Sequence, residues 1–314
     1  MSQAGAPRAA SVTHQHLLDV MLAHVGSATP GNLLRVLDAG CGDGLLLAFL
    51  ARGLAWHRPD RVLELHGFDV HDHGVQPKDY FDRTLDLLRT QVPDTPWEQR
   101  LALISDRAPW PWPEARFDVV VSNQVLEHVR DHRHFLTQLR RVLRPGGFSV
   151  HVFPTRHCWI EPHLHIPFVH RIGTPKGVAR YIEVATRLGF GRHDPACESR
   201  RAYALRHADY LAHNVNYRSV RELHALGMQS GLEVEFGHTA GLYLTKLRQL
   251  LGRSPRPVRA QPPQPPGAPP RGALPYCWLS SVTLVLRRPE SGCAENEAIA
   301  APTLRADRSE VPRT

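Results

Sequence analysis

An acid and three alternating glycines form the segment of this chain that is best suited to hold a small, charged ligand. The run from Asp38 to Gly44 has the sequence Asp-Ala-Gly-Cys-Gly-Asp-Gly and joins an apolar strand segment to an apolar helical segment, 45–50. Glycine permits positive φ angles and a close approach of a ligand to the backbone, and a helix start offers unpaired N–H groups. Asp38 can accept a hydrogen bond from the cationic end of a ligand. The run therefore predicts a ligand site at a strand-to-helix turn.

Three more polar side chains, Asp69, Asp106 and Asn123, lie at or next to the ends of expected strands. A carboxylate accepts two hydrogen bonds at once, which suits Asp69 to the two hydroxyls of a ribose. Ligands of open α/β sheets lie at the carboxyl ends of the strands, so these side chains are expected around one site. We interpret Asp118, which lies inside a strand, as structural.

A second group of polar residues lies between Arg156 and Pro167, where Glu161, His163 and His165 alternate with other residues. The prolines of this segment favour an extended backbone, which would place the three side chains on one face. A histidine titrates near neutral pH and suits general-base work on a hydroxyl. The alternative is that these polar groups hydrogen-bond one part of the fold to another.

Strands and helices must alternate to position these residues, and this alternation predicts a parallel α/β sheet. The chain is expected to begin with an amphipathic helix over 14–25. A helix that starts at the N-cap Asp131 is expected to end near residue 143, where Gly146 and Gly147 turn the chain. The expected strands are 33–37, 63–68, 101–104, 117–122, 148–153, 232–236 and 278–286, with a further helix over 242–251.

The chain divides into five expected regions. Residues 1–29 form a helix and lead-in, 30–154 the ligand-binding core, and 155–231 a helical insert that covers a substrate. Within the insert, Thr174 and Pro175 are expected to start one helix, and Ser219 with Glu222 forms a capping box. Residues 232–288 complete the sheet and are interrupted by a loop, 254–272, that holds eight prolines. The polar tail 289–314 is expected to be disordered.

Composition narrows the class of protein further. The chain has 314 residues, 42% of them hydrophobic and 22% charged, and no stretch approaches the roughly 20 apolar residues of a membrane span. The first eleven residues lack the apolar core of a signal peptide, so we expect a cytoplasmic protein. Five scattered cysteines without a C-x-x-C pair favour neither a disulfide framework nor a zinc ribbon.

The net charge of +8 raises the possibility of a nucleic-acid partner. Four arginines and no acid lie in residues 252–272, so half of the excess belongs to the proline-rich segment. There is no basic run interleaved with aromatic residues. We therefore do not expect nucleic-acid binding.

The run from Asp38 to Gly44 resembles the first motif of the class I S-adenosylmethionine (SAM) methyltransferases, D/E-x-G-x-G-x-G, and further motifs of that family follow in order over residues 30–153. The resemblance implies a Rossmann-like, mostly parallel seven-stranded sheet whose last strand is antiparallel, with SAM as cofactor and a transferase activity of class 2.1.1. It places Asp69 on the ribose, Asp106 on the adenine and Asn123 beside the methionine moiety. The residues implied to bind SAM are Asp38, Gly40, Cys41, Gly42, Gly44, Asp69, Val70, Asp106 and Asn123.

The segment from Gln124 to His128 resembles the E-x-x-E-H segment of ubiquinone-pathway O-methyltransferases and small-RNA terminal methyltransferases. In those families the acids and the histidine can hold a divalent metal. Here Gln124 stands at the first position and removes a charged ligand, so we expect no metal. Glu127 is interpreted as a buried hydrogen-bond anchor, and His128 as a wall of the site or a catalytic group.

The sequence thus predicts a SAM-dependent methyltransferase that methylates an oxygen of a small-molecule acceptor, a sugar or a secondary metabolite, under the insert. His163, His165 and His128 are the candidate catalytic residues. Two alternatives stay open: an RNA methyltransferase with a metal-assisted site, and a catalytically silent scaffold whose proline-rich segment docks a partner with an aromatic groove. The sequence does not name the acceptor or the oligomeric state, and it does not separate O- from N- or C-methylation.

Overall fold

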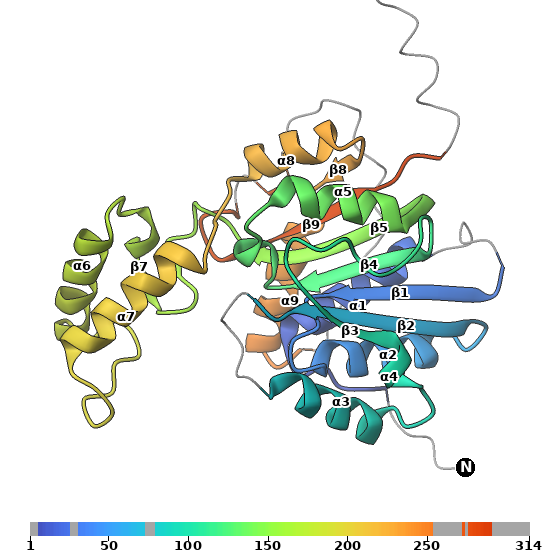
Figure 1. Ribbon diagram of the computed structural model, residues 1–314, viewed down its shortest axis with the longest axis horizontal. Helices are drawn as coiled ribbons and strands as arrows, with labels where there is room; N and C mark the ends of the chain where they lie inside the picture. The colour runs from blue at the N-terminus through green and yellow to red at the C-terminus, as the bar shows by residue number, and fades with distance from the viewer. Residues whose placement is uncertain (1–5, 26–30, 73–78, 254–271, 274–275, 291–314) are drawn as a thin grey trace, which may run out of the picture.

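The computed structural model describes residues 6–25, 31–72, 79–253, 272–273 and 276–290. They fold around a seven-stranded sheet of order β3-β2-β1-β4-β5-β9-β8 (Figure 1). β1, β2, β3, β4 and β5 pair in parallel, whereas β9 pairs antiparallel with both β5 and β8. The predicted sheet with its antiparallel last strand is confirmed. The strands are β1 (Leu33–Ala39), β2 (Val62–Val70), β3 (Leu101–Ile104), β4 (Phe117–Asn123), β5 (Leu143–Pro154), β8 (Glu233–Glu235) and β9 (Ser281–Arg287).

The turn expected before the fifth strand is part of the strand itself. β5 begins at Leu143, which pairs with Phe117, and the register between β4 and β5 then shifts before Val119 pairs with Phe148. Gly146 has φ +73° within this irregular stretch. The two glycines therefore make a bulge inside a strand rather than a connection in front of it.

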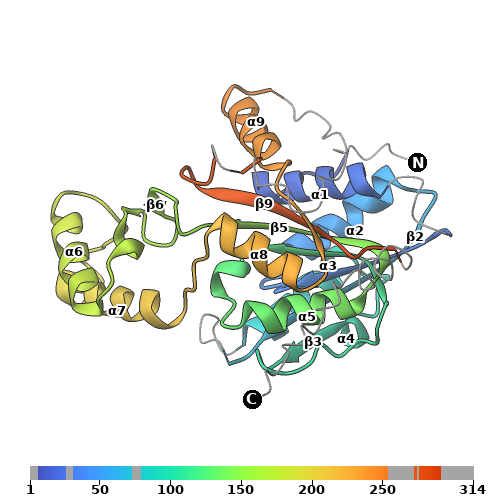
Figure 2. The ribbon, with the colours of Figure 1, turned by 90° about the horizontal axis from the view of Figure 1, so that it is seen from above.

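Helices cover both faces of the sheet (Figure 2). α1, α2, α3 and α9 lie on one face, and α5 and α8 lie on the other. Asp131 caps α5 through the backbone N–H of His134, as predicted. The helices are α1 (Val12–His24), α2 (Leu45–His57), α3 (Tyr80–Gln91), α4 (Trp97–Arg100), α5 (His132–Val142), α8 (Val220–Gln229) and α9 (Thr239–Leu250), with a 3-10 turn, η1 (Leu126–His128).

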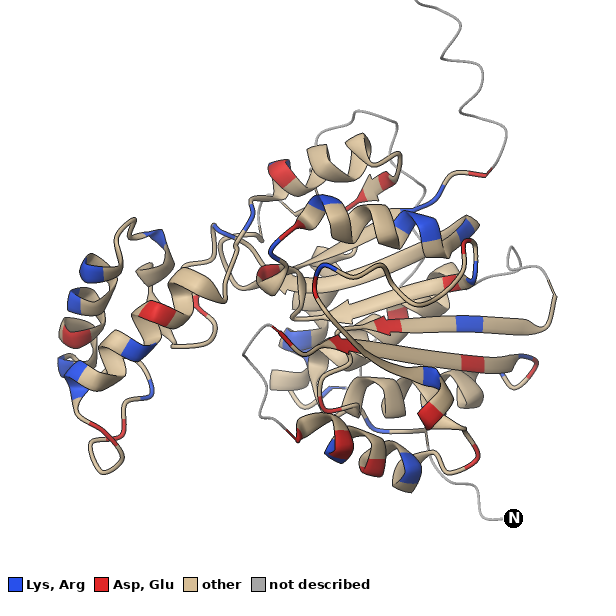
Figure 3. Cartoon of the chain, in the orientation of Figure 1, with Lys and Arg blue, Asp and Glu red and all other residues tan. Residues whose placement is uncertain are grey.

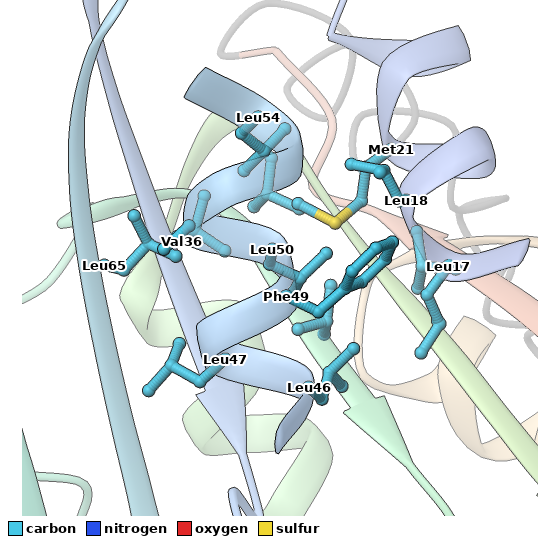
Figure 4. Packing of buried hydrophobic residues seen from close by; sticks show 14 of the residues in the cluster. Leu17, Leu18, Met21, Val36, Leu46, Leu47, Phe49, Leu50, Leu54 and Leu65 are labelled. Carbon is cyan, nitrogen blue, oxygen red and sulfur yellow. The ribbon is translucent and has the colours of Figure 1, made fainter. Parts of the chain in front are cut away.

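The core follows from the two-residue alternation of the strands. Along β4, Val119 and Val121 pack toward α1 and α2, whereas Val120 packs toward α5. Figure 4 shows α2 between α1 and the sheet, with Phe49 turned toward the leucines of α1. Helices packed on both faces of the sheet thus fix the strand ends that carry the polar residues.

The insert after β5 stands apart from the sheet in Figure 1, to its left. It holds a small hairpin, β6 (Ile160–Glu161) with β7 (Ile166–Pro167), a 3-10 turn, η2 (Val169–Arg171), and the helices α6 (Pro175–Arg187) and α7 (Arg200–His213). These elements share an apolar cluster of their own. Thr174 caps α6 and Ser219 forms the predicted capping box of α8, which packs against α5 and β8.

Two predicted regions fall largely outside the described residues, namely most of the proline-rich loop (254–271) and most of the polar tail (291–314). Among the helices that the structure does describe, none combines the length and the hydropathy needed to cross a bilayer.

Candidate functional site

A cavity of about 580 Å³ opens at the carboxyl ends of β1, β2, β3 and β4. This is the edge at which open α/β sheets bind ligands. Six of the predicted residues line it: Gly40, Gly42, Asp69, Val70, Asp106 and Asn123. The lining residues also include His128, the one candidate catalytic histidine found there, whereas Asp38, Cys41 and Gly44 are buried and are not among the lining residues.

The glycine turn is held in a shape that side chains would disrupt. Gly40 has φ +83°, and a Cβ atom there would lie 2.5 Å from Cγ2 of Val125. Gly44 has φ +78° and starts α2, with its N–H donated to the carbonyl of Cys41. The backbone of the turn therefore faces the cavity closely, as the first motif requires.

Asp69 links the second strand to the glycine turn. One carboxylate oxygen accepts from the N–H of Gly42 at 2.8 Å and the other from the N–H of Val70 at 2.7 Å. Each carboxylate oxygen has a second lone pair. Asp69 is thus fixed at the cavity wall by the backbone of the glycine turn.

Two acceptors at neighbouring strand ends lack donors within the described chain. Asp38 is fully buried, and neither of its carboxylate oxygens has a hydrogen-bond partner there. Burial, and next the charges of Asp69 and Asp43, raise the pKa of Asp38 well above its usual range. The side-chain oxygen of Asn123 is likewise buried without a partner in this part of the structure. Such acceptors fit a ligand that brings N–H donors and a positive charge.

Asp106 is paired with an arginine from a later part of the chain. Its carboxylate lies 3.1 Å from a guanidinium nitrogen of Arg130, and its N–H donates to Asp72. Both Asp106 and Arg130 line the cavity. A bound base would therefore meet a carboxylate already held in place by a cation.

An apolar wall of the cavity was missed by the sequence analysis. The rings of Trp110 and Phe68 lie 4.7 Å apart between centroids, and those of Trp110 and Phe135 lie 5.2 Å apart. All three residues line the cavity and offer a flat, apolar surface to a ring. The Trp-Pro-Trp segment before β4 was the feature that could have indicated it.

Beyond the cavity, η1 meets the hairpin of the insert. The rings of His128 and His163 lie 5.1 Å apart, and Tyr210 of α7 packs against both. Nδ1 of His128 lies 2.7 Å from the carbonyl oxygen of Asn214. Two of the three candidate catalytic histidines are therefore brought together, one from the core and one from the insert.

Glu161 holds His163 in place through a hydrogen bond to its ring. It is fully buried, and its carboxylate accepts from Nδ1 of His163, from the hydroxyl of Tyr217 and from the N–H of Leu164, each at 2.6 Å. Burial alone would raise the pKa of Glu161, but the hydrogen bond from His163, followed by its charge and by the other donors, brings that pKa below the ordinary value. Glu161 is thus a carboxylate that orients an imidazole.

The extended backbone expected across this segment is wrong. Residues 162–165 form a tight turn between β6 and β7, and His165 has φ +59°. His165 is exposed, and its Nε2 lies 3.2 Å from a guanidinium nitrogen of Arg192. Glu161 and His163 meet because the chain turns, whereas His165 lies away from His128.

Glu127 is buried next to the histidine pair but does not anchor by hydrogen bonds. It is 1% exposed, and in the described residues neither side-chain oxygen has a hydrogen-bond partner. Burial raises its pKa to about 8. Gln124 does not share this place, since its amide reaches the carbonyl of Val152 and the hydroxyl of Ser281.

A family model described as a methyltransferase domain matches residues 14–235. The chain is 34% identical over 124 residues to a probable S-adenosylmethionine-dependent methyltransferase of Mycolicibacterium smegmatis, covering 38% of each chain. It is 32% identical over 143 residues to an uncharacterized methyltransferase of Mycobacterium tuberculosis, covering 45% of this chain and 57% of that protein. A ubiquinone biosynthesis O-methyltransferase of Cereibacter sphaeroides is 34% identical over 124 residues, with 37% and 40% covered.

The chain spans only about 38 to 57% of the length of these curated relatives. Among solved structures, an S-adenosylmethionine-dependent methyltransferase from Mesorhizobium loti aligns with a TM-score of 0.48 and 18% identity, covering 88% of this chain and all of that one.

Proposed function

This chain belongs to the methyltransferase-domain family and is a SAM-dependent methyltransferase of the class I fold, and we propose that it methylates a hydroxyl group of a small-molecule acceptor. The observation that carries the proposal is the pairing of His163 with the buried carboxylate of Glu161, next to His128 at the rim of the cavity. An oriented imidazole suits an acceptor that must lose a proton.

The residues around the cavity fit SAM. Asp69 can accept from the ribose hydroxyls, and Asp106 with Trp110 and Phe135 can hold the base. The oxygens of Asp38 and Asn123, which have no hydrogen-bond partner among the described residues, match a ligand that carries an ammonium group. A volume of about 580 Å³ lies within the range of small-molecule sites.

SAM supplies an activated methyl group, which bonds to the acceptor oxygen as the carbon–sulfur bond breaks and its electron pair stays on sulfur. The protein's task is to position the acceptor and to take the hydroxyl proton. Glu161 accepts from Nδ1 of His163, so Nε2 of a neutral His163 carries the lone pair that can accept this proton. The proton then passes from the imidazole to solvent.

The acceptor is proposed to lie between the core and the insert. His163 comes from the insert and His128 from the core, so a hydroxyl near both would contact both parts. This arrangement supports a compact acceptor, a sugar or a secondary metabolite.

The charges on the helices bear on the RNA alternative. Figure 3 shows acidic and basic residues alternating along α3, whereas α6 and α7 each carry three arginines or lysines and one acidic residue. RNA binding draws on clustered basic side chains. Strong binding of an unrelated RNA that falls steeply with salt would favour the RNA alternative.

The test is incorporation of label from methyl-labelled SAM into sugars and phenolic metabolites, each paired with its amine analogue. Label in the hydroxyl compounds alone supports the proposal, and label in the amine analogues alone contradicts it. His163→Asn should lower the turnover of a hydroxyl substrate about 100-fold or more. The Kd of SAM should stay unchanged, because His163 is absent from the described cavity lining. His213→Asn, at an exposed position of α7, is the matched control.

A further inference from the structure

We propose that Glu127, His128 and His163 form a binding site for a divalent transition-metal ion. Each of these residues offers one ligand atom, and the three atoms lie within 4.8 Å of one another in the described structure. Two belong to η1 of the core, and the third comes from the turn between β6 and β7.

Both imidazoles have the tautomer that metal ligation needs. The carbonyl oxygen of Asn214 can only accept, so Nδ1 of His128 carries the hydrogen and Nε2 carries the lone pair. The carboxylate of Glu161 imposes the same tautomer on His163. Metal-binding histidines are oriented in this way, by a carbonyl or a carboxylate on the second ring nitrogen.

The buried carboxylate of Glu127 independently indicates a cation site. Its side chain is 99% removed from solvent, and neither oxygen finds a donor within the described chain. Leaving such a group unsatisfied is costly, whereas a bound cation would satisfy it. The buried carboxylate thus fits the third ligand of a two-histidine, one-carboxylate set.

This donor set selects the class of ion. Two imidazoles and one carboxylate suit Zn²⁺, Fe²⁺ or Co²⁺, whereas Mg²⁺ and Ca²⁺ prefer sites made of oxygen atoms. Tetrahedral coordination at about 2.1 Å requires donors about 3.4 Å apart, so small side-chain movements close the set around the ion. Three protein ligands leave a position open, as in catalytic zinc sites.

The sequence predicted no metal because Gln124 replaces an acid. In the structure Gln124 is turned toward β5 and β9, and the missing ligand is supplied instead by His163. Sequence spacing could not show this, because the insert brings His163 to η1 from 35 residues further along the chain.

A second cluster with the right residue types, His24, Glu235 and His238, lacks the right tautomers. Arg287 donates to Nδ1 of His24 at 3.0 Å, so Nε2 of His24 carries the hydrogen and points it at Nε2 of His238, 2.8 Å away. A hydrogen-bonded pair therefore occupies the place that an ion would need. This cluster serves as an internal control.

The role of the ion in catalysis rests on the proposed function, whereas its binding does not. An acceptor hydroxyl at the open position would be acidified by the ion, and its proton would leave to solvent. His163 would then act as a ligand rather than as the base. The metal-free protein would retain the slower route through His163.

The experiment is titration of the chelator-treated full chain with Zn²⁺ and with Co²⁺, in the presence of a competing chelator that suppresses weak binding by surface histidines. We expect one tight equivalent, and for Co²⁺ an absorption band typical of low coordination number. Glu127→Gln and His163→Ala should weaken this binding at least 10-fold, and Glu161→Gln 10- to 100-fold through the orientation of His163. His238→Ala should leave it unchanged.

The proposal would be overturned if His238→Ala no longer bound one metal ion tightly. It would also be overturned if both Glu127→Gln and His163→Ala still did. Circular dichroism of each variant confirms that it is folded, and the nearly isosteric Glu127→Gln guards against a misfolded His163→Ala. The binding assay contains no acceptor, so a failed metal site and a failed choice of acceptor give different results. A protein that binds Zn²⁺ but labels only amines would keep the site and refute O-methylation.

Discussion

His163 donates a hydrogen bond from Nδ1 to the buried carboxylate of Glu161 at 2.6 Å, although only one residue separates them in the chain. The tight turn between β6 and β7 makes this contact possible, and Leu164 donates its N–H to the same carboxylate. Tyr217, from the segment before α8, adds a third donor. Two separate stretches of the insert, the hairpin and the segment before α8, therefore share one buried charge.

Tyr217→Phe should destabilise the protein by about 1.5–3 kcal/mol, because it removes a hydrogen bond to a buried carboxylate. Urea unfolding followed by circular dichroism measures the change. Tyr181→Phe, on α6, is the control and should stay within about 0.5 kcal/mol. Equal effects of the two substitutions would contradict the role given to Glu161.

Asp69→Asn should weaken SAM binding by about 10- to 100-fold. The amide keeps the shape of the side chain but loses its charge. It also has one acceptor oxygen instead of two, so it cannot accept from the N–H groups of both Gly42 and Val70 as the carboxylate does. Isothermal titration with SAM measures the Kd. Asp86→Asn, an exposed position on α3, is the control, and a loss of affinity common to both variants would argue against a specific contact.

The motifs on the strand ends could be predicted because they depend on local rules. A strand that ends in Asp69 and a turn that begins at Gly40 fix positions along the chain, and the parallel sheet then brings them to one edge. The caps at Asp131 and Ser219 were equally local, and both were confirmed.

The acceptor side could not be predicted in the same way. The contact of His128 with His163, and the carbonyl of Asn214 behind it, depend on how the insert folds back on η1. The same holds for Arg130, which reaches Asp106 across 24 residues. Long-range pairs of this kind leave no periodicity in the sequence. His165 was misplaced because an extended backbone was expected where residues 162–165 form a turn, which brings its imidazole to Arg192.

Gly40→Ala should destabilise the protein and abolish SAM binding, whereas Gly189→Ala should cause only the milder effect of an unfavourable φ. The two glycines have nearly the same angle, +83° and +84°, but a Cβ at position 40 would lie 2.5 Å from Val125, and one at position 189 would meet open space. The conformational cost is about 1–2 kcal/mol at either position. Thermal unfolding with and without SAM gives both quantities.

A similar loss of stability in Gly40→Ala and Gly189→Ala would mean that Val125 moves aside freely. If Gly40→Ala also still bound SAM, the close packing of Gly40 against Val125 would be contradicted. The difference between the two variants isolates the steric contribution, because the conformational cost cancels.

The free energy of unfolding should fall as the pH drops below about 6.5, partly because of His151. This imidazole is fully buried between the hydroxyls of Ser122 and Ser149, and burial lowers its pKa to about 3. Between these two pH values the unfolded chain binds a proton at His151 that the folded chain does not, so stability rises with pH across this window, by about 1.4 kcal/mol per unit.

His151→Gln should therefore reduce the slope of stability against pH by up to about 1.4 kcal/mol per unit between pH 4 and 6.5, whatever its effect on stability at pH 7. Urea unfolding at several pH values measures the slope for each variant. His213→Gln, whose imidazole is largely exposed, should leave the slope as it is in the unmodified chain. Identical slopes for all three proteins would show that His151 is protonated without unfolding, which its burial between two hydroxyls argues against.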